Sequence, residues 1–426
     1  MSEWKEYKLG ELCNIRRGAS PRPIHDYLSE QGMPWVKISD ATSENSRFIK
    51  KTVQKIKLSG VQKSLKVNPG DFILSNSATP GIPKFMNIEA CIHDGWLLLS
   101  NFNKIDNLFL YYFLLHERPN LANQGNGSVF TNLKTDIVKS LKINIPDLPT
   151  QAVTAEILSS LDDKIELNNK INQELETLAQ TLFKQWFIDF EFPNENGEPY
   201  KSYGGEMMES ELGEIPKSWE VTRISTLDYK LQTGTRPKGG VGGITSGVPS
   251  IGAESVKGLG YYDFSKIKYV SNEFASKMKR GKVEGYELLI YKDGGKPGTF
   301  MPHFSMFGEG FPFETFFINE HVFLLDFFDK EFNSFCYFYF DSKYVKPVFE
   351  NNGGKAAIPG INQEDVKNLL IFRPDNEIVK IFGEFAKSSI TTILKNCKEN
   401  IQLSNLRDEL LPKLISGELE INEINN

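Results

Sequence analysis

The stretch from Gln151 to Phe190 constrains the fold most, because it contains neither Pro nor Gly and carries an apolar stripe. Alternating steps of four and three join the stripe residues Leu161, Ile165, Leu175, Ala179, Leu182 and Trp186. This spacing predicts one long helix with a coiled-coil seam. Such a helix would span about 57 Å, more than the width of a small domain. An ordinary core helix is the alternative, although few core helices run this far unbroken.

A second long helix is predicted from about Asn376 to Ser416, with apolar positions that do not form one regular seam. The first stripe also contains Asn168 and Asn172, and polar residues on a seam fix register and partner. Each helix needs a place to bury its apolar side. We therefore expect the two helices to pack on each other in antiparallel orientation.

The sequence contains an internal repeat with a period of about half the chain, which indicates duplicated domains. Each copy places a Trp before a run that ends in Gly and a basic Pro-containing turn: Trp4 precedes Gly18 to Pro23, and Trp219 precedes Gly234 to Lys238. Matching features follow in both copies, in the same order. They are a Gly-x-Pro turn, a buried strand with a polar loop, an aromatic helix, a Gly/Asn loop, a short acidic-capped helix, and a strand before Pro146 or Pro374.

The composition is that of a globular protein, with 40% hydrophobic and 24% charged residues, and the length suggests two or three domains. No apolar run reaches the roughly 20 residues of a membrane span. The N-terminus lacks the features of a signal peptide, and the four cysteines form no CxxC pair. We expect a cytoplasmic protein with reduced thiols, no membrane association and no bound metal.

The net charge of −6 hides two basic segments. Residues 1–70 and residues 221–300 each hold 13 Lys+Arg against 7 Asp+Glu, so each segment carries +6 and the rest of the chain carries −18. Two basic patches in an acidic frame favour two phosphate-facing surfaces. Chance clustering on solvated faces is the alternative for this feature.

No catalytic constellation is present in the sequence. It has no GxGxxG after a strand, no GxxxxGK[ST], and no Asn-Pro-Pro-Tyr/Phe tetrapeptide, and its five histidines are scattered. A duplicated fold with basic patches and no chemistry indicates a reader of two half-sites rather than an enzyme.

Two motifs resemble the specificity (S) subunits of Type I restriction–modification enzymes. They are the run from Leu182 to Pro193, followed by Gly213 to Trp219, and the C-terminal run from Leu406 to Leu419. The resemblance covers the whole chain. It departs at the helix starts, where the family's Pro-Leu-x-Glu-Gln is Asp147 to Gln151 here and the Gln is absent from the second copy.

The resemblance implies an α+β fold class: two similar globular target recognition domains separated by two long antiparallel coiled-coil helices. Recognition domain 1 would cover residues 1–150, the central helix 151–190, an acidic connector 191–215, recognition domain 2 residues 216–375, and the C-terminal helix 376–426. It further implies a non-catalytic subunit that binds double-stranded DNA at a bipartite, asymmetric site. Such a subunit recruits two methyltransferase (M) subunits, which use S-adenosylmethionine on adenine, and restriction/translocase (R) subunits, which use ATP and Mg²⁺. The chain itself would need no cofactor.

Candidate DNA-contacting residues lie in or next to Gly/Pro turns of the basic segments. The basic candidates are Arg16, Arg17, Arg22, Lys37, Arg236, Lys238, Lys257, Lys292 and Lys296. Arg is the better base reader because its fork matches guanine. Ser75, Asn76 and Thr79 lie on a loop equivalent to Lys292–Lys296, where Asn either pairs with adenine or caps a turn.

Candidate residues for packing or partner binding lie on the two long helices. They are Leu161, Ile165, Leu175, Leu182, Phe183, Trp186, Phe187, Ile393, Ile401 and Leu410. Phe183 and Phe187 are expected to dock the M subunits or to pack on a recognition domain.

Three other functions compete with this reading. A free-standing bipartite DNA-binding protein or inhibitor would act without M subunits, and a DNA-modifying enzyme would act alone. A scaffold that binds no DNA is disfavoured by the matched basic patches.

Overall fold

The computed structural model describes residues 4–43, 46–124, 133–294, 296, 298–354 and 358–419. The chain divides into two compact units. Unit 1 comprises Met1–Glu166 and Gln402–Asn426, and unit 2 comprises Leu167–Ile401. Each unit therefore contains one globular α+β domain together with part of each long helix. The predicted Gly125-Asn126-Gly127 loop lies outside the described residues.

Unit 1 is built on a five-stranded sheet with the order β2-β11-β8-β9-β5. The pairs are antiparallel except for β5 with β9. The strands are β2 (Asn14–Arg17), β11 (Trp96–Ser100), β8 (Phe72–Ser75), β9 (Pro83–Met86) and β5 (Phe48–Ile49). Phe72 and Leu74 enter one core cluster, and Ile73 enters another. Because successive side chains point to opposite faces, both faces of this sheet are buried, which explains the unbroken apolar run of β8.

A second five-stranded sheet of unit 1 has the order β3-β6-β4-β10-β7. Its strands are β3 (Leu28–Ser29), β6 (Gln54–Ile56), β4 (Met33–Val36), β10 (Ala90–Ile92) and β7 (Leu65–Val67). A separate pair joins β1 (Lys5–Lys8) to β12 (Lys142–Ile145). The helices of this domain are α1 (Leu9–Leu12), α2 (Ile38–Thr42), α3 (Leu58–Val61), α4 (Asn107–Gln124) and α5 (Thr135–Lys139).

Unit 2 contains the same arrangement in a shorter form. Its main sheet has the order β16-β23-β20-β21-β18, again antiparallel except for the last pair. These strands are β16 (Lys230–Thr233), β23 (Val322–Asp326), β20 (Leu288–Tyr291), β21 (Phe304–Met306) and β18 (Gly258–Leu259). The second sheet consists of β19 (Tyr269–Val270), β17 (Val248–Ile251) and β22 (Phe317–Ile318). A pair of β15 (Val221–Arg223) and β24 (Leu370–Phe372) matches β1 and β12.

The predicted duplication is confirmed by the strands that the two units share. Equivalent strands keep their order and direction, including the parallel pairing of β4 with β10 in unit 1 and of β17 with β22 in unit 2. The helices of unit 2 are α7 (Asn272–Lys277), α8 (Lys330–Phe340), α9 (Lys346–Gly353) and α10 (Gln363–Lys367). The predicted acidic connector is partly ordered structure, since β13 (Met207–Ser210) and β14 (Gly213–Pro216) form a hairpin.

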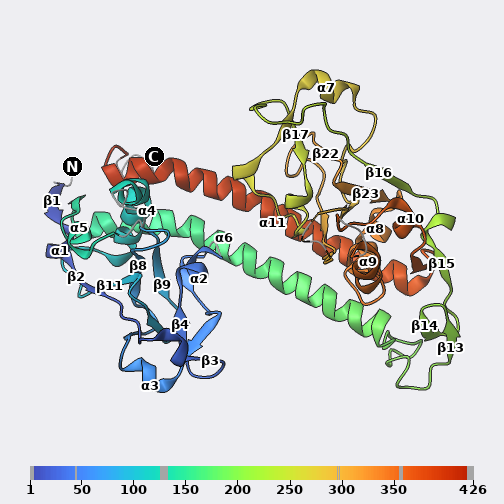
Figure 1. Ribbon diagram of the computed structural model, residues 1–426, viewed down its shortest axis with the longest axis horizontal. Coiled ribbons are helices and arrows are strands. Elements are labelled where there is room, and N and C mark those ends of the chain that lie inside the picture. The colour runs from blue at the N-terminus through green and yellow to red at the C-terminus, as the bar shows by residue number, and fades with distance from the viewer. Residues whose placement is uncertain are drawn as a thin grey trace. The chain divides into compact units, whose positions relative to one another are not determined.

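Both long helices are confirmed (Figure 1). Helix α6 runs from Leu148 to Phe183 and continues as a π-helical turn, Lys184–Ile188, while α11 runs from Glu377 to Ser416. Helix α6 begins three residues before the predicted Gln151, because the Asp147 carboxylate accepts a hydrogen bond from the Thr150 N–H at 2.9 Å. Hydrogen bonding from Thr150, first from its side chain and then from this N–H, lowers the pKa of Asp147.

Within unit 2, α6 and α11 are antiparallel and joined by the two predicted asparagines. Asn168 is fully buried and donates to Asn400 at 2.9 Å, and Asn172 accepts from Asn396 at 2.8 Å. Later residues of α6 therefore pair with earlier residues of α11, as antiparallel packing requires. A buried amide that must find its partner specifies the register of the pair.

Within unit 1, charged groups join the same two helices to the globular domain. The buried Asp162 carboxylate accepts from the Tyr112 hydroxyl of α4 at 2.8 Å and from Arg407 of α11 at 2.6 Å. Arg47, which is only 6% exposed, binds Asp163 and donates to Glu166 at 3.2 Å. Burial alone would lower the pKa of Arg47, but these carboxylates raise it, so the guanidinium stays charged.

Candidate nucleic-acid interface

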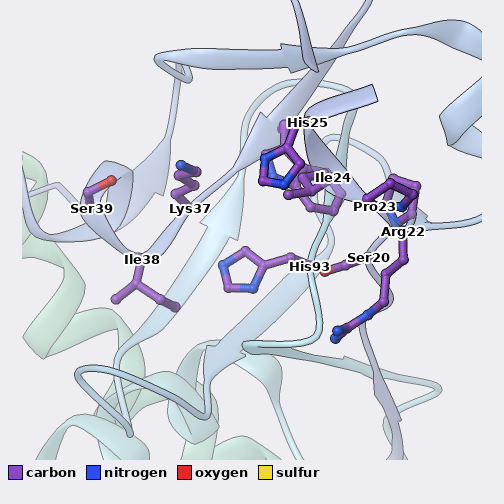
Figure 2. A pocket seen from close by; sticks show the side chains of 11 residues that line it. Ser20, Arg22, Pro23, Ile24, His25, Lys37, Ile38, Ser39 and His93 are labelled. Carbon is purple, nitrogen blue, oxygen red and sulfur yellow. The ribbon is translucent and has the colours of Figure 1, made fainter. Parts of the chain in front are cut away.

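A first cleft in unit 1 is formed by the turn after β2, the loop after β10 and the segment after β4. It encloses about 770 Å³, and its lining includes Ser20, Arg22, His25, Trp35, Lys37 and His93. Figure 2 shows side chains of Arg22, His25, Lys37 and His93 around the same space. Basic groups and an aromatic ring in one hollow suit a nucleic-acid ligand.

Asp94, directly beside this first cleft, is the centre of its polar network. Its carboxylate accepts a hydrogen bond from the Ser20 hydroxyl at 2.7 Å and one from Arg22 at 3.3 Å. Its backbone carbonyl accepts a hydrogen bond from Arg17 Nε at 2.8 Å. The bond from Ser20 is the main cause that lowers the pKa of Asp94, so the carboxylate is ionised near neutral pH.

His93 precedes Asp94 and contributes a neutral ring to the first cleft. Its Nδ1 accepts a hydrogen bond from the Gly95 N–H at 2.8 Å, which places the ring proton on Nε2. Burial lowers the pKa of His93, and the ring lies 5.9 Å from that of Trp35. His93 therefore offers a hydrogen-bond donor without adding a positive charge.

A second cleft occupies the equivalent place in unit 2. It encloses about 350 Å³ between the turn after β16, the loop after β22 and the segment after β17, and its lining includes Arg236, Ser250, Glu254, Lys268, Glu320 and His321. Glycines occupy matching positions: a side chain on Gly18 would meet the His93 carbonyl, and one on Gly234 would meet the Ile318 carbonyl. This close approach brings the two loops of each cleft together.

The charges in the second cleft are arranged differently. Arg236 lies 3.4 Å from the Glu320 carboxylate, Lys268 pairs with Glu254, and His321 contacts Asp293. Lys292 donates to the Glu320 backbone carbonyl at 3.1 Å. The second cleft thus presents carboxylates as well as cations, whereas the lining of the first combines two cations, Arg22 and Lys37, with histidine, Trp35, apolar and serine side chains.

The predicted basic residues divide into two groups. Arg22 and Lys37 line the first cleft, with Arg17 beside it, and Arg236 lines the second, with Lys292 behind it. Arg16 is exposed on β2. The other three are exposed outside the cleft linings: Lys238, Lys257 (5.5 Å from the Tyr261 ring) and Lys296. Their contact with DNA remains a prediction.

The predicted polar loop of unit 1 has its side chains turned inward. The fully buried Ser75 hydroxyl donates to the Thr79 carbonyl at 2.6 Å and accepts from the Ile82 N–H at 2.8 Å. Asn76 is 4% exposed, and its Oδ1 has no hydrogen-bond partner among the described residues. The Ser75 hydroxyl therefore stabilises the turn, and base reading by Ser75, Asn76 and Thr79 stays a prediction.

The predicted helix residues face the interior of their units to different degrees. Phe183 and Phe187 are buried against rings of α8 and α11, so these two pack on the globular domain of unit 2. Ile165 and Ile393 are buried, whereas Leu161, Leu175, Leu182, Trp186, Ile401 and Leu410 are half-buried. Among apolar residues with large exposure on these helices are Leu167, Leu178, Ile381 and Leu406.

Sequence reasoning missed Asp94, His93, Glu254, Glu320 and His321 as cleft residues. The repeat held a signal for two of them, because Asp94 and Glu320 both lie two residues after equivalent strands, β10 and β22. Within the described part of the chain, no group of three or more His, Cys, Asp or Glu side chains could hold a metal ion. The described helices include none that is long and apolar enough to cross a membrane.

Comparisons with known proteins agree with the predicted resemblance. Residues 1–177 match the family described as the Type I restriction modification DNA specificity domain. The chain is 27% identical to the MjaIX specificity subunit of Methanocaldococcus jannaschii, over 99% of this chain and 95% of that one. It is 25% identical to the HindI specificity subunit of Haemophilus influenzae, over 98% and 100%. The fold is similar to the crystal structure of a Type I S subunit from M. genitalium, with 13% identity, a TM-score of 0.56, and coverage of 97% and 96%.

Proposed function

We propose, on the premise that this chain is a Type I restriction–modification specificity subunit, that it reads a bipartite and asymmetric DNA site. The first cleft would contact one half-site and the second cleft the other. One observation carries the proposal: equivalent clefts occur in both copies but have different linings. Because the two clefts lie at equivalent places in their domains, a shared role in DNA contact is supported. Because their lining residues differ, the two clefts are expected to read different target bases.

Within this proposal, Arg22 and Arg236 are the principal DNA contacts. Both lie in Pro-containing turns at the edge of a cleft, and their side chains are 79% and 53% exposed. A guanidinium can bind phosphate or pair bidentately with guanine. Lys37 and Lys268 would add charge beside them.

No residue of this chain is assigned a catalytic role. Methylation would be performed by M subunits that bind S-adenosylmethionine, and cleavage by R subunits that use ATP and Mg²⁺. The long helices are the surface proposed for M-subunit docking, because Leu167 and Leu178 are each 52% exposed on α6.

Replacing Arg22 or Arg236 with Ala tests the DNA contacts. The full chain, assembled with M subunits, should bind its target more weakly. The slope of log binding constant against log salt should fall by about one for each lost phosphate contact. Lys142→Ala in unit 1 and Lys277→Ala in unit 2 are charge-matched controls, because both are exposed and paired with glutamates outside the cleft linings.

Unchanged affinity and salt slope for both arginine variants would refute these contacts. The same assay without M subunits separates a subunit from a free-standing DNA-binding protein. A subunit should bind its target tightly only in the assembled complex.

A further inference from the structure

We propose that Asp94 and Glu320 are equivalent positioning residues, each of which holds the DNA-reading arginine of its cleft and keeps that arginine from binding phosphate indiscriminately. The inference rests on the proposed function, because it assumes that Arg22 and Arg236 contact DNA. It assigns a role in DNA binding to two acidic residues, whereas the contacts proposed above are all cations.

The first observation is that both copies build the same pair from different sequence. Asp94 follows β10 and Glu320 follows β22, each by two residues, and each partner is an arginine directly before a proline. The Arg22 to Asp94 distance is 3.3 Å, and the Arg236 to Glu320 distance is 3.4 Å. In both cases the backbone carbonyl of the acidic residue also binds a cation, Arg17 in unit 1 and Lys292 in unit 2.

The second observation is that these pairs contribute little to folding. The side chains of Asp94 and Glu320 are 38% and 31% exposed, and ion pairs this open to solvent contribute little to stability. One Glu320 oxygen, Oε2, is enclosed without a hydrogen-bond partner among the described residues. An incompletely satisfied carboxylate beside a proposed DNA contact is better explained by function than by stability.

A carboxylate next to DNA affects binding in two ways. It repels phosphate, so it lowers non-specific affinity, which is mainly electrostatic. It also orients the guanidinium fork before DNA arrives, and this reduces the ordering cost of a correctly placed contact. The two effects together raise the ratio of specific to non-specific binding.

Asp94→Asn tests this role directly, because asparagine can still accept the hydrogen bond from Ser20. In the full chain assembled with M subunits, binding to random-sequence duplex should strengthen, and its salt slope should steepen by about one. Binding to the target duplex should weaken, so the specificity ratio should fall about tenfold. Glu320→Gln should act in the same way in unit 2.

Matched controls separate this effect from a general change in charge. Glu89→Gln and Glu273→Gln each remove one exposed negative charge from the same units outside the cleft linings, and they should leave the ratio unchanged. In an Arg22→Gln background, Asp94→Asn should no longer weaken binding to the target duplex, because Asp94 orients that contact through Arg22. If Asp94 only stabilised the fold, Asp94→Asn would still weaken binding to the target duplex in the Arg22→Gln background.

The outcomes distinguish the two proposals. If the wild-type complex fails to prefer any sequence over random duplex, the proposed function is wrong. If the wild type is specific but Asp94→Asn and Glu320→Gln match their controls, or lower both affinities together, the positioning role is wrong.

Discussion

Gln151 and Asn376 show how single side chains fix the starts of the two long helices. Gln151 is fully buried; its amide oxygen accepts the Asp106 N–H at 2.9 Å, and its amide group donates to two backbone carbonyls. It therefore fastens α6 to the loop before α4. Asn376 instead caps α11 by accepting two N–H groups of its first turn, at 2.9 and 3.2 Å. The second junction thus keeps its helix start without the glutamine.

Glu176 on α6 makes stability depend on pH. Burial raises the pKa of this carboxyl, and its Oε1 lies 3.4 Å from the Tyr337 hydroxyl. Glu176→Gln removes the buried charge and keeps an acceptor, so the variant should be more stable than wild type at pH 7. The folded protein binds the Glu176 proton more tightly than the unfolded chain does. Wild-type stability should therefore rise relative to the variant as pH falls through the raised pKa toward the ordinary value of 4.5.

Denaturant unfolding of both proteins between pH 7.5 and pH 4.5 measures the difference. Glu174→Gln is the control, because Glu174 is exposed on the same helix. A stability difference that is constant over this pH range would contradict the assignment.

At the residue scale, the sequence could single out Arg22 and Arg236 as candidate DNA contacts, but not the carboxylates that pair with them. Arginine in a Pro turn of a basic segment already indicates a phosphate or base contact. Asp94 is 72 residues from Arg22, and Glu320 is 84 residues from Arg236. Only the folded loops bring these groups together, and nothing local marks either acid as part of a cleft.

At the element scale, both long helices were predictable because their signals are local and repeated over many turns. The apolar stripe of α6 and the polar Asn168 and Asn172 were sufficient to predict the helix and its partner contacts. The buried strands β8 and β20 and the strands β12 and β24 before Pro146 and Pro374 were predictable as strands. The order of strands in the sheets was not, because sheet order depends on contacts distant in sequence. The hairpin of β13 and β14 was missed because its acidic, Gly-containing sequence also suits a loop.

The end of α6 is anchored in unit 2 by aromatic packing. Phe187 is fully buried, with ring centroids 5.1 Å from Phe335, 5.3 Å from Phe382 and 5.5 Å from Trp219. Phe187→Ala should lower the free energy of unfolding by about 3–5 kcal/mol, because it leaves a large cavity. Chemical denaturation of the full chain measures this loss.

Leu178→Ala is the control for this prediction, since Leu178 is 52% exposed on the same helix and should change stability by less than about 0.5 kcal/mol. Equal losses for the two variants would show that the aromatic cluster does not anchor α6.

At the scale of the whole molecule, the chain is one α+β topology used twice, with α6 and α11 each contributing to both units. The two copies share strand order and cleft position while their cleft residues differ. This combination is what a reader of two unlike half-sites requires, because the scaffold can stay constant while the base contacts change. The sequence places one basic segment in each copy, which is consistent with one DNA-facing surface in each unit.

Mapping methylated adenines in DNA from cells that express the chain with the proposed M subunits tests the central claim most directly. We expect one bipartite motif with two unlike halves separated by unspecified bases. Arg22→Ala should relax only one half, and Arg236→Ala only the other. A single continuous motif, or relaxation of the same half by both variants, would contradict the account.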